Sequence, residues 1–323
     1  MKEEEIRPHK IFDKFLSIAA EDCNIFFSTS NRRKINCPAC NSQGEHSFIK
    51  NSFSYELCPK CETLFVSPRP DEESFNNFYT NSSSAKYWAT TFYKETENAR
   101  KKLIWKDKIK LINNLVSKYS SNNPTFIDIG GGYGVFGEEM TRLKKDVIVI
   151  EPSPSLSKQC KEKNLKVINK FLEDVNSDEL PKGRKVFVSF ELFEHLYSPR
   201  TFLEKLYSLM TPGDLFIFTT LSSFGPDIRG LWKDSKSVSP PHHLNFFNPI
   251  SIRILSENIG FSVKRVETPG KLDLDILKNS KDQIKDNFLK IFIEFSSEND
   301  KERLQTLISE IGYSSHMLTC LMK

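Results

Sequence analysis

The strongest constraint on the fold of this chain is a glycine-rich turn directly after an apolar run. Residues 126–134 read Phe-Ile-Asp-Ile-Gly-Gly-Gly-Tyr-Gly, which predicts a buried strand, a tight turn and then a helix. Glycines permit positive φ and a close approach of the backbone to a ligand, which a Cβ would obstruct. A ligand-free turn would seldom hold so many, since each costs roughly 0.5 to 1 kcal/mol of conformational entropy relative to alanine. The segment therefore predicts a nucleotide-cofactor site.

The identity of the cofactor depends on charge at this turn. Residues 132–137 also fit the dinucleotide fingerprint Gly-x-Gly-x-x-Gly, so NAD is an alternative. Asp128 favours S-adenosylmethionine, because its carboxylate would repel a pyrophosphate but suits the ammonium and sulfonium groups of the methyl donor. Glu151, at the end of the next strand, would then accept hydrogen bonds from both ribose hydroxyls. The predicted donor-binding residues are Asp128, Gly130, Gly131, Gly132, Gly134, Glu151, Phe171, Leu172 and Phe190.

Four of the seven cysteines form two Cys-x-x-Cys pairs with seventeen residues between them. This is zinc-ribbon spacing, in which two knuckles supply a tetrahedral set of thiolates and leave no open position for water, so the zinc would be structural. Two disulfides or a redox motif are the alternatives, and the doubled motif favours zinc. The predicted ligands are Cys37, Cys40, Cys58 and Cys61. The other cysteines, Cys23, Cys160 and Cys320, are predicted to be small buried hydrophobes.

Composition limits the partners and the location. The formal net charge is +4, and the lysines are scattered rather than gathered in a stripe, which argues against a nucleic-acid partner. The basic residues near the ribbon are Arg32, Arg33, Lys34, Lys50 and Lys60. No apolar run approaches the roughly 20 residues of a membrane span, and residues 1–5 lack the order of a signal peptide. We expect a cytoplasmic protein, and the sequence leaves its oligomeric state open.

Hydrophobic patterning predicts three regions. A helix over 11–27 and the zinc ribbon occupy residues 1–70, and an aromatic-rich helical connector that could cap the substrate covers 71–120. After a break at Asn122-Asn123-Pro124, strands and helices alternate over 121–323, which predicts an α/β fold with a Rossmann-like, mostly parallel seven-stranded sheet. A helical insertion interrupts it at about 270–312. The predicted strands are 126–129, 147–151, 166–168, 186–190, 215–221, 261–267 and 315–321, with helices over 199–210 and 249–258.

Two polar segments follow predicted strands. Residues 190–196 read Phe-Glu-Leu-Phe-Glu-His-Leu, and residues 240–247 read Pro-Pro-His-His-Leu-Asn-Phe-Phe. Open sheets of this type bind ligands at the carboxyl ends of their strands, so both segments are expected at the cleft. Histidine carries protons near neutral pH, which makes His195, His242 and His243 candidates for acid–base catalysis. Each could instead be a hydrogen-bonded structural residue.

The order of these motifs resembles a known family. The zinc ribbon, residues 126–134, Glu-His-Leu-Tyr-Ser-Pro at 194–199 and His-His-Leu-Asn-Phe-Phe-Asn-Pro at 242–249 are similar to class I S-adenosylmethionine-dependent methyltransferases with an N-terminal zinc-binding domain. Within that group the chain resembles sugar C-methyltransferases and relatives encoded with surface-polysaccharide genes. The resemblance spans about residues 37–260, and the ending Ser-Ser-His-Met at 314–317 is similar too.

The resemblance implies roles for four residues. In sugar C-methyltransferases a Glu-His pair after the fifth strand supplies the base that removes a proton next to a keto group. His243 matches that histidine, whereas His242 replaces the glutamate, so the methylated atom stays open. His195 matches the family's histidine, and Tyr79 resembles a substrate-facing tyrosine whose alternative role is helix packing.

The function implied is methyl transfer to a small polar acceptor, most simply a sugar or nucleotide-linked sugar, with a histidine base. Two alternatives stand beside it. One is an RNA methyltransferase that docks RNA on the ribbon, and the other is a non-catalytic cofactor-binding protein.

Overall fold

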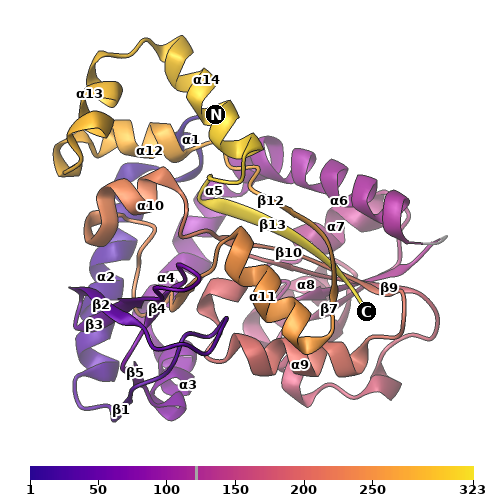
Figure 1. Ribbon diagram of the computed structural model, residues 1–323. Helices are drawn as coiled ribbons and strands as arrows, with labels where there is room; N and C mark the ends of the chain where they lie inside the picture. Colours follow the sequence, from indigo (N-terminus) through magenta and orange to yellow (C-terminus); the bar gives the residue numbers. More distant parts are fainter. Residues whose placement is uncertain (121–122) are drawn as a thin grey trace. The chain divides into compact units, whose positions relative to one another are not determined.

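The computed structural model describes residues 1–120 and 123–323 (Figure 1). Asn122, in the predicted helix-breaking segment, and the predicted domain boundary at 121 lie outside the described residues. The chain forms two compact units, and it passes between them several times. The ribbon unit comprises residues 1–100, 221–252 and 267–317, and the sheet unit comprises 101–220, 253–266 and 318–323.

The main sheet has seven strands in the order β12-β13-β10-β9-β6-β7-β8, which confirms the predicted Rossmann-like α/β fold. Its strands are β6 (Thr125–Ile129), β7 (Val147–Ile150), β8 (Lys166–Ile168), β9 (Lys185–Phe190), β10 (Leu215–Leu221), β12 (Ser262–Glu267) and β13 (His316–Met322). Neighbours from β8 to β10 pair in parallel. The chain order reverses between β6 and β9, where open parallel sheets have their ligand crevice. Each strand end lies within one residue of its prediction.

Both faces of the parallel strands are covered, so most of their residues are apolar. Along β10, Leu215 and Ile217 join a core with α6 (Lys106–Tyr119) and α7 (Val135–Arg142). Phe216 and Phe218 alternate with them and stack on each other, and Phe216 also contacts Phe202 of α9 (Pro199–Leu209). Figure 1 shows α6 and α7 on one side of these strands and α9 on the other. Two further helices are α8 (Pro154–Glu162), which follows β7, and α11 (Pro249–Ile259), which precedes β12.

The predicted start of α9 is confirmed. Ser198 is its N-cap, with the side chain accepting from the Thr201 amide, and Pro199 follows in the first turn. Ser153 and Pro154 begin α8 in the same way. Short 3₁₀ turns cover Leu172–Asp174, Ser177–Glu179 and Phe193–His195 in the sheet unit, and Trp232–Asp234 and Lys281–Gln283 in the ribbon unit.

The ribbon unit is built around a four-stranded sheet in the order β11-β4-β3-β2. Its strands are β2 (Glu45–Lys50), β3 (Phe53–Leu57), β4 (Leu64–Val66) and β11 (Asn245–Phe246), and β1 (Arg32–Arg33) pairs separately with β5 (Arg69–Pro70). Helix α2 (His9–Phe27) follows the short α1 (Glu3–Ile6). The aromatic connector is helical: α3 (Glu72–Asn81), α4 (Ser83–Tyr87), the π-helix η1 (Trp88–Phe92) and α5 (Tyr93–Arg100), with the π-helix η2 (Lys101–Trp105) opening the sheet unit.

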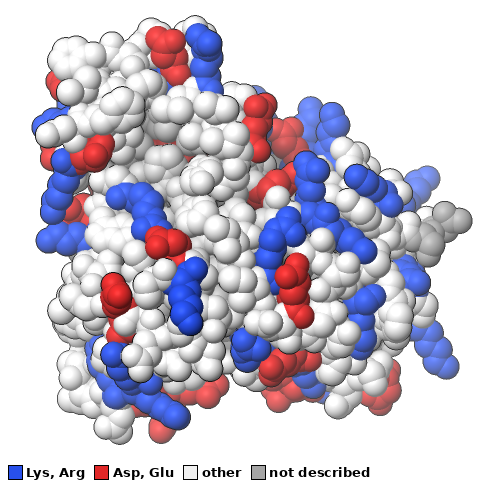
Figure 2. All heavy atoms as spheres, in the orientation of Figure 1, with Lys and Arg blue, Asp and Glu red and all other residues white. Residues whose placement is uncertain are grey.

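The predicted insertion is helical as well. It contains α12 (Asp273–Asn279), α13 (Asn287–Phe295) and α14 (Glu298–Glu310), which share an apolar core with Leu231 of α10 (Pro226–Leu231). On the face drawn in Figure 2, basic and acidic side chains are interspersed. Within the described ranges, no helix is both long enough and apolar enough to cross a membrane.

Candidate functional site

The glycine turn has the positive φ angles that its sequence predicts. Gly130, Gly132 and Gly134 have φ of 67°, 54° and 66°, in the left-handed region that side chains disfavour. Gly131 is required for a different reason, because a Cβ there would lie 2.6 Å from Val149 Cγ1 and 2.8 Å from the Asp128 carboxylate. The glycines therefore leave the backbone of the turn between β6 and α7 accessible to a ligand.

Asp128 points its carboxyl group into this turn and is only 1% exposed. Neither of its oxygens accepts a hydrogen bond from any residue that the structure describes. Burial, and secondly the nearby charge of Glu151, raise the pKa of Asp128 to about 8. A buried carboxyl group without a donor is costly, so this position fits a ligand that brings donors of its own.

Glu151 is the first residue after β7 and is held against the turn. Its Oε2 accepts from the Gly132 amide at 2.9 Å and its Oε1 from the Ser153 amide at 2.9 Å. Burial raises the pKa of Glu151, while these two amide hydrogen bonds oppose the rise. Each oxygen keeps a lone pair free, which fits a vicinal pair of hydroxyls.

The remaining predicted cofactor residues follow β8 and end β9. The Phe171 side chain is 57% exposed, whereas Leu172 is buried. Phe190 packs with its ring centroid 5.1 Å from those of Trp105 and Phe136. The structure thus brings Asp128, Gly131, Gly132 and Glu151 into one cluster, and it places Phe190 at the carboxyl end of the neighbouring strand.

Sequence reasoning missed a polar network at the same strand ends. Lys108 Nζ donates to Glu191 Oε1 at 3.2 Å and to Thr219 Oγ1 at 3.3 Å, and Thr219 Oγ1 donates to the same carboxylate oxygen at 2.7 Å. Thr220 Oγ1 donates to Glu194 Oε2 at 2.8 Å. Burial, and secondly the charge of Glu191, raise the pKa of the Glu194 carboxyl group to about 8. Lys108 could have been noticed, because it falls on the apolar face of its helix.

His195 closes the 3₁₀ turn Phe193–His195, and its amide donates to Leu192 O at 2.9 Å. Its ring is half-buried. This histidine belongs to the sheet unit, whereas His242, His243 and Tyr79 belong to the ribbon unit.

His242 lies inside the ribbon unit. Its Nε2 is 2.9 Å from Ser84 Oγ, and that hydroxyl also donates to Asp22 at 2.5 Å. The ring packs between Phe15 and Phe78, at centroid distances of 5.3 and 5.0 Å. Burial, with a smaller contribution from His243, lowers the pKa of His242 to about 3, so the ring is neutral near physiological pH. These contacts join the loop to α2 and α4.

His243 has a different environment. Its Nδ1 lies 2.7 Å from the Ser237 carbonyl oxygen, so Nδ1 carries the hydrogen of the neutral ring and Nε2 keeps the basic lone pair. The Tyr55 hydroxyl donates to the His243 carbonyl oxygen at 2.7 Å. Two residues later, β11 pairs with β4 of the ribbon. The segment that carries the two histidines, residues 240–247, which we call the histidine loop, therefore contributes a strand to the four-stranded sheet of the ribbon unit. No sequence pattern had indicated this pairing.

Tyr79 lies on α3 with 42% of its surface exposed. Its ring centroid is 5.1 Å from that of Phe78, which also contacts His242. Tyr79 is thus packed on one side and accessible on the other.

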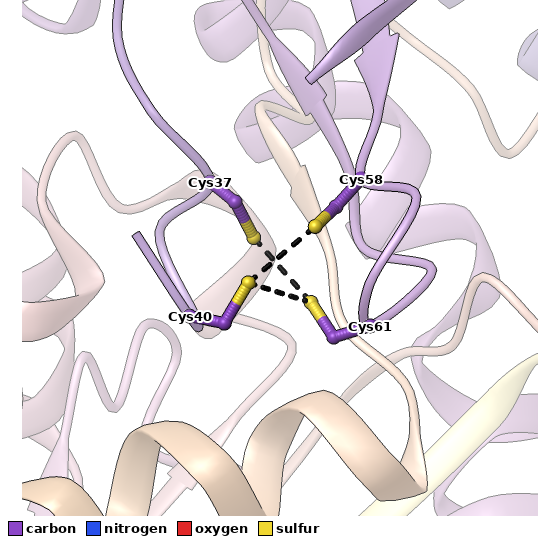
Figure 3. Close-up of side chains that lie close together, drawn as sticks. All are labelled: Cys37, Cys40, Cys58 and Cys61. Carbon is purple, nitrogen blue, oxygen red and sulfur yellow. Dashed lines mark hydrogen bonds between the residues drawn. The ribbon is translucent and has the colours of Figure 1, made fainter. Parts of the chain in front are cut away.

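The four ribbon cysteines converge on one point (Figure 3). Sγ atoms are 3.5 Å apart for Cys37 and Cys61, 3.4 Å for Cys40 and Cys58, and 3.5 Å for Cys40 and Cys61. A tetrahedral zinc site with Zn–S bonds of about 2.3 Å needs sulfurs about 3.8 Å apart, so the cluster fits zinc after a small expansion. The structure describes all seven cysteines and none of them forms a disulfide; Cys23, Cys160 and Cys320 are buried, as predicted.

The two Cys-x-x-Cys knuckles have the same backbone geometry. In each knuckle the backbone amide of the first cysteine donates to the carbonyl oxygen five residues later, Cys37 to Ser42 O at 2.8 Å and Cys58 to Thr63 O at 2.9 Å. The residue after the second cysteine, Asn41 or Glu62, has φ near 60°. Two equivalent knuckles facing each other are typical of a closed, four-thiolate metal site.

The fold and the glycine turn define the class I methyltransferase type, and comparison with known proteins supports this. Residues 98–266, slightly more than half of the chain, match the model of a methyltransferase domain family, and the chain belongs to that family. By family and fold it is a class I S-adenosylmethionine-dependent methyltransferase. A mitochondrial ubiquinone biosynthesis O-methyltransferase from Schizosaccharomyces pombe is 31% identical over 102 residues, which is 30% of this chain. The match spans about 37% of that relative's length.

A solved structure agrees on the fold. The plantazolicin methyltransferase BamL, in complex with a triazolic desmethylPZN analog and SAH, has 15% identity and a TM-score of 0.50, with 77% of this chain and 93% of that chain covered. A SAM-dependent methyltransferase from Archaeoglobus fulgidus has 18% identity and a TM-score of 0.44, with coverage of 66% and 94%.

Proposed function

We propose that this chain is a cytoplasmic enzyme that transfers a methyl group from S-adenosylmethionine to a hydroxyl group of a sugar or nucleotide-linked sugar. The observation that carries the donor assignment is the Glu151 carboxylate, which two loop amides hold beside the glycine turn. In this role Glu151 accepts the ribose hydroxyls, and the unpartnered Asp128 meets the positively charged end of the donor. When bound, the donor supplies an electrophilic methyl group on a cationic sulfur.

His243 is the general base in this proposal. Its Nδ1 hydrogen is held by the Ser237 carbonyl, which fixes the tautomer and makes Nε2 the basic nitrogen of the neutral ring. The acceptor hydroxyl gives its proton to Nε2 while its oxygen attacks the methyl carbon, and the bond from that carbon to sulfur breaks. His195 and Tyr79 orient the acceptor. His242 is a structural residue rather than an assistant to the base, because it is buried and its pKa is lowered to about 3.

Oxygen is the acceptor atom that two observations support. The curated relative named above is an O-methyltransferase. In addition, position 242 holds a buried neutral histidine where sugar C-methyltransferases have a glutamate, so the carboxylate of the Glu-His pair that supplies the base for carbon methylation is missing. The sugar itself is supported by the resemblance of the motifs.

RNA docking on the ribbon has less support. Arg32 Nη1 donates to Ser52 O at 2.8 Å, and the guanidinium lies over the Phe53 ring. Lys50 donates to Ser235 O at 2.8 Å, and burial lowers the pKa of its ammonium to about 8. Two of the five basic residues near the ribbon are thus engaged within the protein and are poorly placed to bind phosphates.

We propose structural zinc at the four cysteines. Asn248 Nδ2 donates to Cys61 O at 2.8 Å, and Ser223 Oγ donates to Glu62 O at 2.8 Å. The metal knuckle therefore supports the segments on both sides of the histidine loop.

The test is a transfer assay with methyl-labelled donor and a panel of free sugars, nucleotide-linked sugars and RNA. We expect label on a sugar hydroxyl, lost in His243→Gln and retained in the control His46→Gln, whose ring is exposed on β2 and contacts Ser54. Label on RNA instead would establish the RNA alternative. Donor binding without transfer to any acceptor would favour the non-catalytic alternative.

A further inference from the structure

The Lys108–Glu191–Thr219 network takes no part in the methyl transfer proposed above. It lies at the carboxyl ends of β9 and β10, one strand away from the glycine turn. The Lys108 side chain is only 8% exposed, and its ammonium lies 5.2 Å from the Trp105 ring centroid and 5.1 Å from that of Phe190. A nearly buried ammonium is costly unless paired, and here its partner is the Glu191 carboxylate.

Glu191 itself is held in an unfavourable backbone conformation. Its φ is 52°, in the left-handed region, although it is not a glycine. Its amide donates to Thr219 O at 3.1 Å, and its carboxylate accepts from the hydroxyl of the same residue. Strained residues that the surroundings fix so closely are concentrated at ligand sites.

The position of Glu191 relative to the cofactor site follows from the sheet. Asp128 of β6 is in register with Val188 of β9, and a Cβ on Gly130 would lie 2.9 Å from Leu192 Cδ2. The segment after β9 thus lies directly against the glycine turn. Across the crevice the strand order is β7-β6-β9, with Glu151 after β7 and Glu191 after β9.

We infer that the Glu191 carboxylate, held by Lys108 and Thr219, recognises the positive charge on the donor's sulfur. This inference rests on the proposed donor site, because Glu151 fixes the ribose on the β7 side and the sulfur end of the donor must then extend toward β9. The side chain of Glu191 is 35% exposed, so its carboxylate can reach a ligand while staying paired. Methyl transfer turns the sulfonium into a neutral thioether, and a carboxylate at this place favours release of the product.

The test needs no acceptor. Calorimetry measures the affinity of the protein for three ligands: S-adenosylmethionine, S-adenosylhomocysteine and an amine analogue. In the analogue a CH group that carries a protonated amino group replaces the sulfonium. The wild-type protein should bind both cationic ligands more tightly than the neutral one. In Glu191→Gln the affinity for the two cations should fall by about tenfold while that for S-adenosylhomocysteine stays the same.

Glu179→Gln is the matched control, since Glu179 also pairs with a lysine, Lys170, at 2.7 Å in the same unit but belongs to a different surface turn. It should leave all three affinities unchanged. Equal wild-type affinity for the charged and neutral ligands would overturn the inference, even if the variant did not fold. An unchanged preference in Glu191→Gln would overturn it as well. Failure of the wild-type protein to bind any of the three would instead contradict the donor site itself.

Discussion

Glu151→Gln tests the donor site most directly, because the structure defines what the substitution removes. The Glu151 carboxylate has one amide partner on each oxygen, which leaves one acceptor position on each for the two ribose hydroxyls. Glutamine keeps a single carbonyl oxygen and no charge. It therefore loses one ribose hydrogen bond and weakens the other, and its NH₂ group faces one of the two loop amides, donor against donor.

The loss should be about 1.5 to 3 kcal/mol, the range of one hydrogen bond to a charged group, which is roughly a 10- to 150-fold weaker Kd. The ribose is common to donor and product, so calorimetry should give the same factor for S-adenosylmethionine and S-adenosylhomocysteine. This equality separates Glu151 from Glu191, whose substitution should affect the cationic ligand alone. Glu162→Gln, an exposed change on α8, is the control.

Two results would refute the reasoning for Glu151. An unchanged affinity for S-adenosylhomocysteine would mean that the carboxylate only braces the loop. Tight binding of NAD, with no binding of the sulfonium donor, would mean that the turn holds a dinucleotide.

Three further perturbations test the cysteine cluster, the proposed base and the buried carboxyl group of the glycine turn. Elemental analysis should find one zinc per chain, and Cys58→Ser should lose the metal and the hydrogen-exchange protection of β3 and β4; intact protection in metal-free protein would contradict this. His243→Gln should lower kcat by about a hundredfold or more at unchanged affinity for S-adenosylhomocysteine, and full turnover would make it structural. The pKa of Asp128 is raised to about 8, so the folded state binds more protons than the unfolded state, and this group lowers stability as pH rises from about 4 to 8. Asp128→Asn should therefore raise the melting temperature of ligand-free protein more at pH 8 than at pH 5, and an equal gain at both would show that Asp128 is ionised in the fold.

The main sheet could be predicted closely because each parallel strand consists mainly of apolar residues. Strands β8 and β10 begin and end at the predicted residues. The knuckles and the glycine turn could be predicted for a related reason, since their chemistry depends on residues a few positions apart in the chain.

Contacts between distant segments could not be predicted in this way. Strand β11 has two residues, too few for any periodicity, and it belongs to the ribbon sheet only because it pairs with β4 nearly two hundred residues earlier. The adjacent histidines show the same limit. His242 packs against α2 and α4, whereas His243 bonds to the Ser237 carbonyl. Two adjacent residues of the same type cannot be told apart from the sequence alone.

The pairing of β11 with β4 would give the proposed zinc site a role in the enzyme. The proposed base is held through its carbonyl by Tyr55 of β3, and Asn248, just beyond β11, is held by the Cys61 carbonyl. Tyr55 is fully buried, so its hydroxyl cannot exchange this bond for one to water without exposing the ribbon core. A structural metal that orders the knuckles also orders these two anchors. The zinc would thus act on catalysis at a distance, by fixing the loop that carries His243, with no open coordination site of its own.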